Sequence, residues 1–417
     1  MRPVLPLPGL YSVEQRFRVS GIDDIAGAVR AEIDRICPGE RVSPGDTVAV
    51  TAGSRGIRGI DLITRSVIDT LMEKGARPFI VPAMGSHGGA TAEGQKKVLA
   101  GYGITEESMG CEIRSSMDVV VIGETSLGTP VFLDRHASEA DHIAVINRVK
   151  PHTKLCGSVE SGLLKMCLIG LGKQEGARTY HRAIDRHSWM EVVNSVSDKI
   201  IRNSRILFGL AILQNAREGI GRIEALLPEE FAAREPGLLN EARQMMASLP
   251  VREIDLLIVD EMGKEISGTG MDTNITGRKE GADMKVTRVF VRDLSTATMG
   301  NAQGIGLADF TTSRLVDKID YQALYINSRT AYRTDSCKIP MTLENDYEAL
   351  RVAAEMAGCK SPDDLRVVWI KNTLDLEKIL VSGNMLEEIS GKPYTSVTGG
   401  PDGFEFDEKG FLVSPLD

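Results

Sequence analysis

The chain has 417 residues, which is long for one hydrophobic core, so we expect two domains. Its formal net charge of −9 argues against a general nucleic-acid or membrane-surface binder, because such partners require a basic face. No apolar run approaches the roughly 20 residues of a membrane span, and the first residues lack the apolar core of a signal peptide. None of the six cysteines forms a C-x-x-C pair, so we expect a cytoplasmic protein with free thiols.

Strand-like and helix-like segments alternate through the first half of the chain. Short β-branched runs predict strands, and apolar residues at helical spacing predict helices. The expected strands are 46–51, 77–82, 119–122, 130–133, 142–147 and 206–213, and the expected helices are 60–74, 92–101 and 189–202. This order is typical of an α/β domain with a mostly parallel sheet, whose ligands bind at the carboxyl ends of the strands.

A charged helical stretch with little sign of a core face, 228–247, precedes renewed strand patterns. Further strands are expected at 254–260, 286–291 and 365–370, helices at 307–318 and 347–357, and a small hairpin at 403–412. We therefore expect three parts: an N-terminal catalytic and cofactor-binding domain (1–248), a C-terminal α/β domain (252–390) and a tail that packs back on either domain (391–417). Both domains are expected to hold mostly parallel sheets flanked by helices, with the active site in the cleft between the domains.

Two glycine-containing loops follow expected strands. In the loop 53–56, successive backbone N–H groups and the Arg55 guanidinium suit an anion, although a tight turn with a solvent-facing arginine has the same pattern. In the loop 85–89, Gly-Ser-His-Gly-Gly, the glycines leave room around His87. This histidine fits a general base, a metal ligand or a phosphate contact.

A third group of reactive residues lies within 149–181. His152 follows a strand and a Lys-Pro pair, Lys165 lies in an apolar segment, and His181 closes the stretch. An apolar setting lowers the pKa of an amine and suits covalent chemistry. A buried helix whose lysine reaches solvent would give the same pattern.

These residues, in this order, resemble the nickel-pincer lactate racemase family, a group of 2-hydroxyacid racemases and epimerases. The likeness covers roughly residues 45 to 185. It rests on the arginine loop at Arg55, the G-[ST]-H loop at His87, the proline-histidine approach to His152, the lysine followed five residues later by glycine (Lys165, Gly170), and His181.

The resemblance implies a nickel-pincer nucleotide (nickel pyridinium thiocarboxylate mononucleotide), covalently linked through Lys165, with His181 as the protein's nickel ligand. It implies that His87 and His152 are the two acid/base groups, while the C2 hydride of a small 2-hydroxyacid moves to the cofactor and returns to the opposite face. Arg55 would hold the substrate. Cofactor-biosynthesis enzymes are the implied protein partners, with no nucleic-acid or membrane partner. Further contacts to the cofactor are implied for Ser54, Ser86 and Gly170.

The chain departs from the family pattern at several positions. Ala52 stands where the family has aspartate, Gly88 where arginine is common, and Leu163 where a second glycine is usual. The second-domain residues that bind lactate are not evident, and Arg278 or Lys279 is the nearest source of a second substrate-binding cation. These departures make lactate itself doubtful as the substrate, whereas the residues implied to hold the cofactor are present.

Three other interpretations use the same residues. A non-redox protein could bind a small phosphorylated or carboxylated ligand in these loops. A metal-assisted hydrolase could use His87, His152 and His181, although the acidic ligand spacing of such sites is absent. The stretch 149–181 also resembles a segment of an iron–sulfur-associated group, but this chain lacks the cysteine clusters of those proteins.

Overall fold

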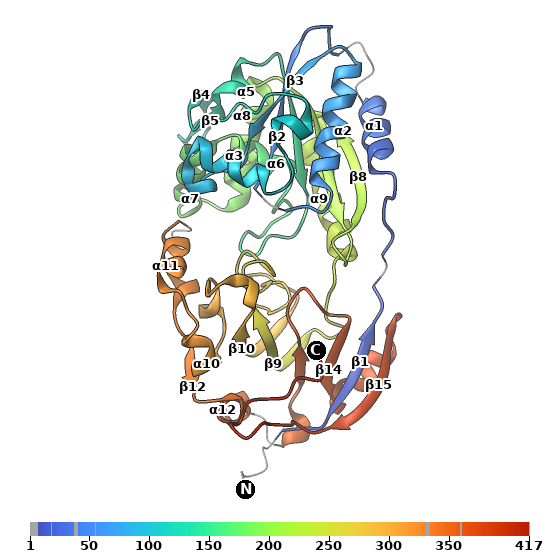
Figure 1. The fold of residues 1–417 in the computed structure, drawn as a ribbon, viewed down its shortest axis with the longest axis vertical. Helices are drawn as coiled ribbons and strands as arrows, with labels where there is room; N and C mark the ends of the chain where they lie inside the picture. The colour runs from blue at the N-terminus through green and yellow to red at the C-terminus, as the bar shows by residue number, and fades with distance from the viewer. Residues whose placement is uncertain are drawn as a thin grey trace. The chain divides into compact units, whose positions relative to one another are not determined.

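The computed structural model describes residues 7–17, 19–36, 41–54, 56–330, 334–358 and 361–416. The chain divides into two compact units: an N-terminal unit, Arg18–Met246, and a C-terminal unit, Met1–Phe17 with Ala247–Asp417. The division near residue 246 lies close to the expected boundary, but the expected domain 1–248 loses its first 17 residues to the C-terminal unit. Figure 1 shows the elements of both units.

A five-stranded sheet forms the centre of the N-terminal unit, in the order β3-β2-β6-β7-β8. The first four strands are parallel and β8 is antiparallel to β7. The strands are β2 (Thr47–Ala52), β3 (Arg77–Pro82), β6 (His142–Arg148), β7 (Ile206–Gln214) and β8 (Ile220–Leu226). The predicted parallel sheet is therefore confirmed, with an antiparallel strand added at one edge.

Both faces of this sheet are covered by helices (Figure 1). Alternate residues of β2 belong to different cores: Ala49 packs in one cluster, while Val48 and Val50 pack in the other. This alternation follows from the two-residue period of a strand. Helices α1 (Ile25–Ile36) and α2 (Ile60–Glu73) cover one face, and α7 (Lys173–Ile184), α8 (Trp189–Asn203) and α9 (Phe231–Met245) cover the other.

Two expected strands do not join the parallel sheet. β4 (Val119–Glu124) and β5 (Pro130–Asp134) pair antiparallel as a separate two-stranded sheet. The short connection between them explains this, because a parallel pair needs a crossover of a dozen or more residues. The shorter helices of this unit are α3 (Ala92–Ala100), α4 (Glu106–Met109) and α5 (Arg135–Glu139).

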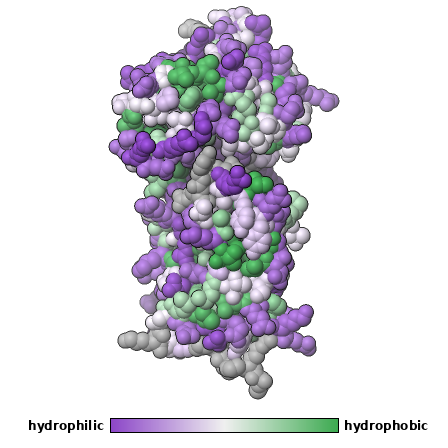
Figure 2. Space-filling model, turned by 90° about the vertical axis from the view of Figure 1, so that its left-hand side faces the viewer, coloured by the Kyte–Doolittle hydropathy of each residue, from purple (hydrophilic) through white to green (hydrophobic). Residues whose placement is uncertain are grey.

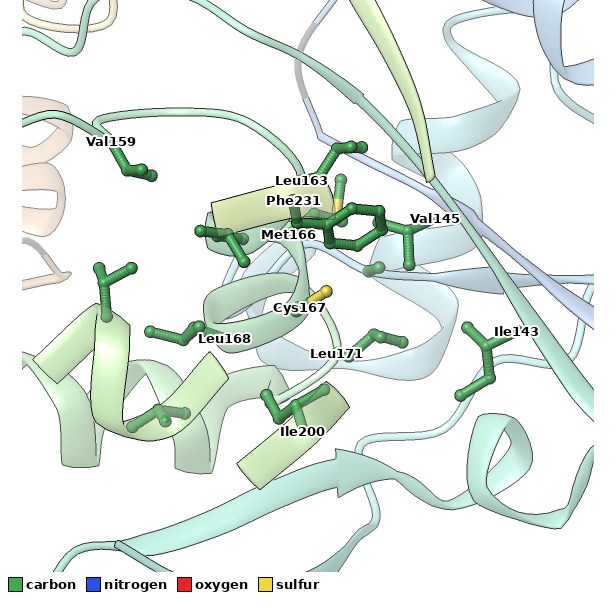
Figure 3. Packing of buried hydrophobic residues seen from close by; sticks show 14 of the residues in the cluster. Ile143, Val145, Val159, Leu163, Met166, Cys167, Leu168, Leu171, Ile200 and Phe231 are labelled. Atoms are coloured by element: carbon green, nitrogen blue, oxygen red, sulfur yellow. The ribbon is translucent and has the colours of Figure 1, made fainter. Parts of the chain in front are cut away.

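The segment that carries Lys165 is a short buried helix. It begins as α6 (Leu163–Lys165) and continues as a π-helix, Met166–Gly170. Leu163, Cys167 and Leu168 are fully buried and lie among Val145 and Phe231 of the same cluster (Figure 3). Lys165 itself is only partly buried, so this helix is held by its apolar neighbours and presents the lysine beside them. π-helical turns of this kind are frequent at functional sites.

An eight-stranded mixed sheet forms the C-terminal unit, in the order β12-β11-β10-β9-β13-β14-β1-β15. The strands from β12 to β13 are parallel, and the last three pair antiparallel. They are β1 (Leu10–Gln15), β9 (Glu253–Met262), β10 (Lys285–Leu294), β11 (Phe310–Thr312), β12 (Met341–Leu343), β13 (Val367–Ile370), β14 (Lys378–Ser382) and β15 (Thr395–Asp402). The helix expected over 307–318 is wrong: β11 and the short α10 (Ser313–Val316) occupy this segment.

The tail belongs to the C-terminal unit. β15 pairs with β1, and the Phe404 ring stacks on Trp369 of β13 with 6.0 Å between ring centroids. The hairpin expected at 403–412 is reduced to one bridge between Phe406 and Leu412. The tail therefore covers one face of the sheet beside α12. The remaining helices are α11 (Tyr321–Thr330), α12 (Asp346–Ala357) and α13 (Leu386–Ser390).

Hydrophilic side chains cover most of the face drawn in Figure 2, and apolar side chains form small separate groups there. Among the described residues, no helix has the length and apolar character needed to cross a membrane. Four cysteines of the described ranges are free thiols: Cys111, Cys156, Cys167 and Cys337. Cys37 and Cys359 lie outside the described residues.

Candidate active site

Three candidate loops meet at one edge of the N-terminal sheet. β2 lies between β3 and β6, and all three are parallel, so their carboxyl ends point the same way. Ser54 follows β2, His87 follows β3 and His152 follows β6. The strand order therefore places the three loops at the same edge of the sheet, as the sequence predicted. Arg55, the expected substrate-binding residue, lies outside the described residues.

The His87 loop has an unusual backbone. Gly85, Gly88, Gly89 and Ala90 all have positive φ, between 54° and 67°. A Cβ at Gly88 would lie only 2.4 Å from the backbone of Gly94 in α3, so glycine is required there. The departure from the family pattern at Gly88 thus has a structural reason. The His87 side chain is exposed, beside the partly buried Ser86.

A buried polar network lies behind this loop. The Lys173 ammonium donates to the carbonyl of Pro82 (2.6 Å) at the end of β3 and to Oε1 of Gln95 (3.2 Å). It also forms an ion pair with Asp134, with 2.9 Å between Nζ and Oδ2. All three side chains are 0–1% exposed. Burial lowers the pKa of Lys173, and the Asp134 carboxylate opposes that shift.

The side-chain amide of Gln95 links this network to the His87 loop by hydrogen bonds. Its Nε2 atom donates to the carbonyl of Gly85 at 3.0 Å and to that of His87 at 3.4 Å. The backbone on both sides of Ser86 is therefore held from behind, while the His87 ring remains exposed.

His152 is fixed by contacts to its own loop. Its Nδ1 atom accepts hydrogen bonds from the backbone N–H groups of Lys154 and Leu155, both at 3.0 Å. Its backbone N–H donates to Oε2 of the buried Glu160 at 2.7 Å, and the other oxygen of Glu160 accepts from Arg243 of α9 at 2.8 Å. Because Nδ1 accepts two N–H groups, the neutral ring carries its proton on Nε2.

The Lys165 helix is anchored at its first turn. The backbone N–H of Leu164 donates to Oε2 of Glu235, a fully buried carboxylate on α9, at 3.0 Å. Asn147 at the end of β6 donates to the carbonyl of Gly162 at 2.6 Å. A Cβ at Gly162 would lie 2.3 Å from Glu235, so the glycine makes room for this cap. Leu163, a departure from the family pattern, fills the core beside Phe231.

The same helix packs tightly against the other two loops. A Cβ at Gly53 would lie 3.0 Å from Met166, and one at Gly85 would lie 3.4 Å from Ile169. A Cβ at Gly170 would lie 2.9 Å from the carbonyl oxygen of Ala83. The role of Gly170 is therefore explained by close backbone packing against the end of β3. The expected contact of Gly170 with a cofactor stays a prediction.

His181 lies in the last turn of α7 and its side chain reaches solvent. The surrounding protein nevertheless lowers the pKa of its imidazole, first by burial and second through the positive charge of Lys165. The neutral imidazole favoured here is the form that binds a metal ion.

The side chains near the candidate site offer few ligands for a metal ion. Among the residues that the structure describes, no group of three or more His, Cys, Asp or Glu could hold a metal ion. His87, His152 and His181 therefore do not form the three-histidine site that a metal-dependent hydrolase would need. One neutral histidine beside a lysine instead suits a cofactor that is attached to the chain and needs a single further ligand.

The two candidates of the C-terminal unit lie in the loop after β9. Arg278 donates to the carbonyls of Leu307 (3.0 Å) and Val286 (2.7 Å) and pairs with Asp309. These contacts occupy its guanidinium and favour a structural role. Lys279 is 8% exposed. Substrate binding by either residue stays a prediction.

Sequence reasoning missed the buried residues that hold the site. Lys173, Glu160 and Glu235 were not singled out, and the segment containing Glu235 was expected to lack a core face. In the structure, α9 buries Phe231, Leu238 and Leu239 as well as Glu235. The lysine in Gly170-Leu-Gly-Lys173 carried a usable signal, because a charged residue directly after a long apolar run is either exposed or paired.

The N-terminal unit is thus a doubly wound α/β domain, with a candidate active site at the carboxyl edge of its parallel strands. Residues 36–191 match the family model described as the lactate racemase N-terminal domain. This segment is therefore similar to the N-terminal domain of lactate racemases, which confirms the resemblance found in the sequence. The match covers more than a third of the chain and ends before β7.

Two solved structures are similar to the chain. The lactate racemase apoprotein from Thermoanaerobacterium thermosaccharolyticum shares 12% identity at a TM-score of 0.49, covering 90% of this chain and 86% of its own. A Thermotoga maritima protein solved by structural genomics shares 14% identity at a TM-score of 0.47, covering 94% and 96%. Likenesses this distant carry no argument about function. Among curated proteins, none matches the chain.

Proposed function

We propose that the protein is a racemase or epimerase that inverts C2 of a 2-hydroxycarboxylate with a nickel-pincer nucleotide. The observation that carries this proposal is the convergence, on one sheet edge, of two histidine loops with the helix of Lys165, which packs against the loops after β2 and β3. This arrangement lies within the segment that matches the lactate racemase N-terminal domain.

Lys165 would hold the cofactor covalently, and the neutral imidazole of His181 would be its ligand from the protein. When bound, such a cofactor supplies a hydride acceptor and donor for C2. The tight packing of Gly53 and Gly85 against the Lys165 helix supports this assignment, because it brings the two loops and the lysine to one place.

The two substrate histidines differ in their surroundings. His87 is exposed on a loop whose backbone is fixed from behind, so its ring is placed to accept or donate a proton. His152 is held with a proton on Nε2, so in this conformation it donates a hydrogen bond to a substrate oxygen. Uptake of a proton by His152 requires its two backbone contacts at Nδ1 to break.

Intact mass and nickel content test the proposal, measured on protein produced together with the enzymes that make the nucleotide. We expect one nickel per chain and a mass increase that is absent from Lys165→Met. A screen of 2-hydroxyacids should then show inversion at C2, and His87→Gln should abolish inversion while the added mass remains. Wild-type protein without added mass or nickel would contradict the proposal, as would tight ligand binding without exchange of the C2 hydrogen.

A further inference from the structure

The network of Lys173, Gln95 and Asp134 joins the two halves of the candidate site. Lys173 is the first residue of α7, the helix that carries His181 in its last turn. Through Pro82 and Gln95 its ammonium contacts the end of β3 and the His87 loop. Lys173 therefore provides a polar connection between the helix of His181 and the loop of His87.

This connection is costly for stability. Taking an ammonium and a carboxylate out of water costs several kcal/mol per ion, and apolar replacements of buried ion pairs are often neutral or stabilising. The backbone of Lys173 also has φ of 53°, in the left-handed region that non-glycine residues avoid. A buried charge on a strained backbone, next to a candidate site, indicates that geometry is maintained at the expense of stability.

We propose that Lys173 is a positioning residue that fixes the His87 loop relative to the helix of His181. Gln95 transmits this constraint, because its Oε1 accepts from Lys173 while its Nε2 donates to Gly85 and His87. Asp134 balances the charge of Lys173 from β5. The inference rests on the proposed function for the roles of the two histidines, but the constraint itself is a property of the chain.

The test uses the full-length protein without cofactor, so that its outcome is independent of the proposed chemistry. Two variants remove different parts of the network: Lys173→Met removes the charge, and Gln95→Met removes the bridge but leaves the Lys173–Asp134 pair. The readouts are the ring NMR signals of His87 and His181 in histidine-labelled protein, assigned with His87→Gln and His181→Gln, and amide hydrogen exchange over 85–90.

In both variants we expect shifted His87 ring signals and amide exchange over 85–90 that is at least about tenfold faster. Arg222→Met is the matched control. Arg222 lies on β8, at the opposite edge of the sheet from β3, and pairs with Glu224 of the same strand and with Glu241 of α9 (2.8 Å), so its removal should leave His87 unchanged. In enzyme loaded with cofactor, Gln95→Met should lower kcat more than it changes KM, with unchanged nickel content.

The proposal is overturned if both variants lower the melting temperature but leave the His87 signals and the exchange over 85–90 as in wild type. That result would assign the network to stability alone. If Lys173→Met does not fold, Gln95→Met decides the question by the same readouts. Absence of nickel or of C2 inversion in wild type would contradict the proposed function and leave these measurements valid.

Discussion

Glu235 and Leu164 form the contact that begins the helix of Lys165. The buried Glu235 carboxylate accepts a hydrogen bond from the Leu164 backbone N–H at 3.0 Å. Glu235 thereby caps the first turn of this helix, a role that a side chain directly before the helix fills in most helices. The partial positive charge of a helix N-terminus favours the ionised carboxylate, while burial disfavours it. Burial prevails and raises the pKa of Glu235 to about 7.

This raised pKa predicts a pH-dependent stability between about pH 4.5 and pH 7. The pKa of Glu235 is near 4.5 in the unfolded chain and about 7 in the folded protein, so the folded protein binds this proton more tightly. The stabilisation that results is complete below about pH 4.5 and is lost as the pH rises through about 7. Relative to Glu235→Gln, wild type should lose about 3 kcal/mol of unfolding free energy across this window. Chemical denaturation at several pH values measures this difference.

Glu229→Gln is the control for this prediction, because Glu229 is exposed at the start of the same segment. Its stability difference from wild type should stay constant with pH. If Glu235→Gln also ran parallel to wild type across the window, the carboxyl would not be buried as the structure has it.

The contacts of His152 predict its tautomer. Because Nδ1 accepts the N–H groups of Lys154 and Leu155, we expect the neutral ring to carry hydrogen on Nε2 only. Two-bond proton–nitrogen correlation spectra of histidine-labelled protein distinguish the two tautomers, and His152→Gln identifies the signals. A ring protonated at Nδ1 would contradict this geometry and restore the simple interpretation of His152 as a base at Nε2.

Sequence patterns predicted the position of the site better than its support. The ends of β2 and β3 could be located because short buried strands followed by glycine loops have a strong local signature, and the end of β6 because a Lys-Pro pair follows its apolar run. His87 and His152 were identified because they stand directly after such strand ends. The antiparallel pairing of β4 with β5 could not be read from strand patterns alone, because they do not state which strands pair.

The buried residues that hold the site could not be predicted, for a different reason. Glu160 and Glu235 look like ordinary charged residues in the sequence, and only tertiary contacts bury them. Each meets a partner far along the chain, such as Arg243 for Glu160. Such long-range polar contacts leave no periodic pattern, so sequence reasoning found the reactive groups and missed the groups that hold them.

The Arg243–Glu160 pair predicts a stability effect centred on the His152 loop. Arg243→Met would remove the guanidinium that pairs with Oε1 of the buried Glu160, whose Oε2 accepts the backbone N–H of His152. Because Arg243 is itself partly exposed, we expect a loss of about 1 kcal/mol rather than the larger cost of a fully buried pair. Thermal unfolding gives the stability change, and hydrogen exchange over 150–161 should rise in this variant.

Arg202→Met is the comparison variant, since Arg202 pairs with Asp198 on the surface of α8. It should change stability by less than about 0.5 kcal/mol and leave exchange over 150–161 unchanged. Equal effects of the two variants on that segment would show that Arg243 does not hold the His152 loop.

Gly88 and Gly89 predict different costs for the same substitution. Both have positive φ, 66° and 67°, so Gly→Ala strains the backbone equally at the two positions, by about 1–2 kcal/mol. Only at Gly88 does the new Cβ also meet protein, 2.4 Å from the backbone of Gly94, whereas nothing lies within 4 Å at Gly89. We therefore expect Gly88→Ala to destabilise the protein by about 2 kcal/mol more than Gly89→Ala and to displace the His87 loop from α3. Denaturant unfolding and the His87 ring signals measure the two effects, and equal losses in both variants would mean that the loop does not pack against Gly94.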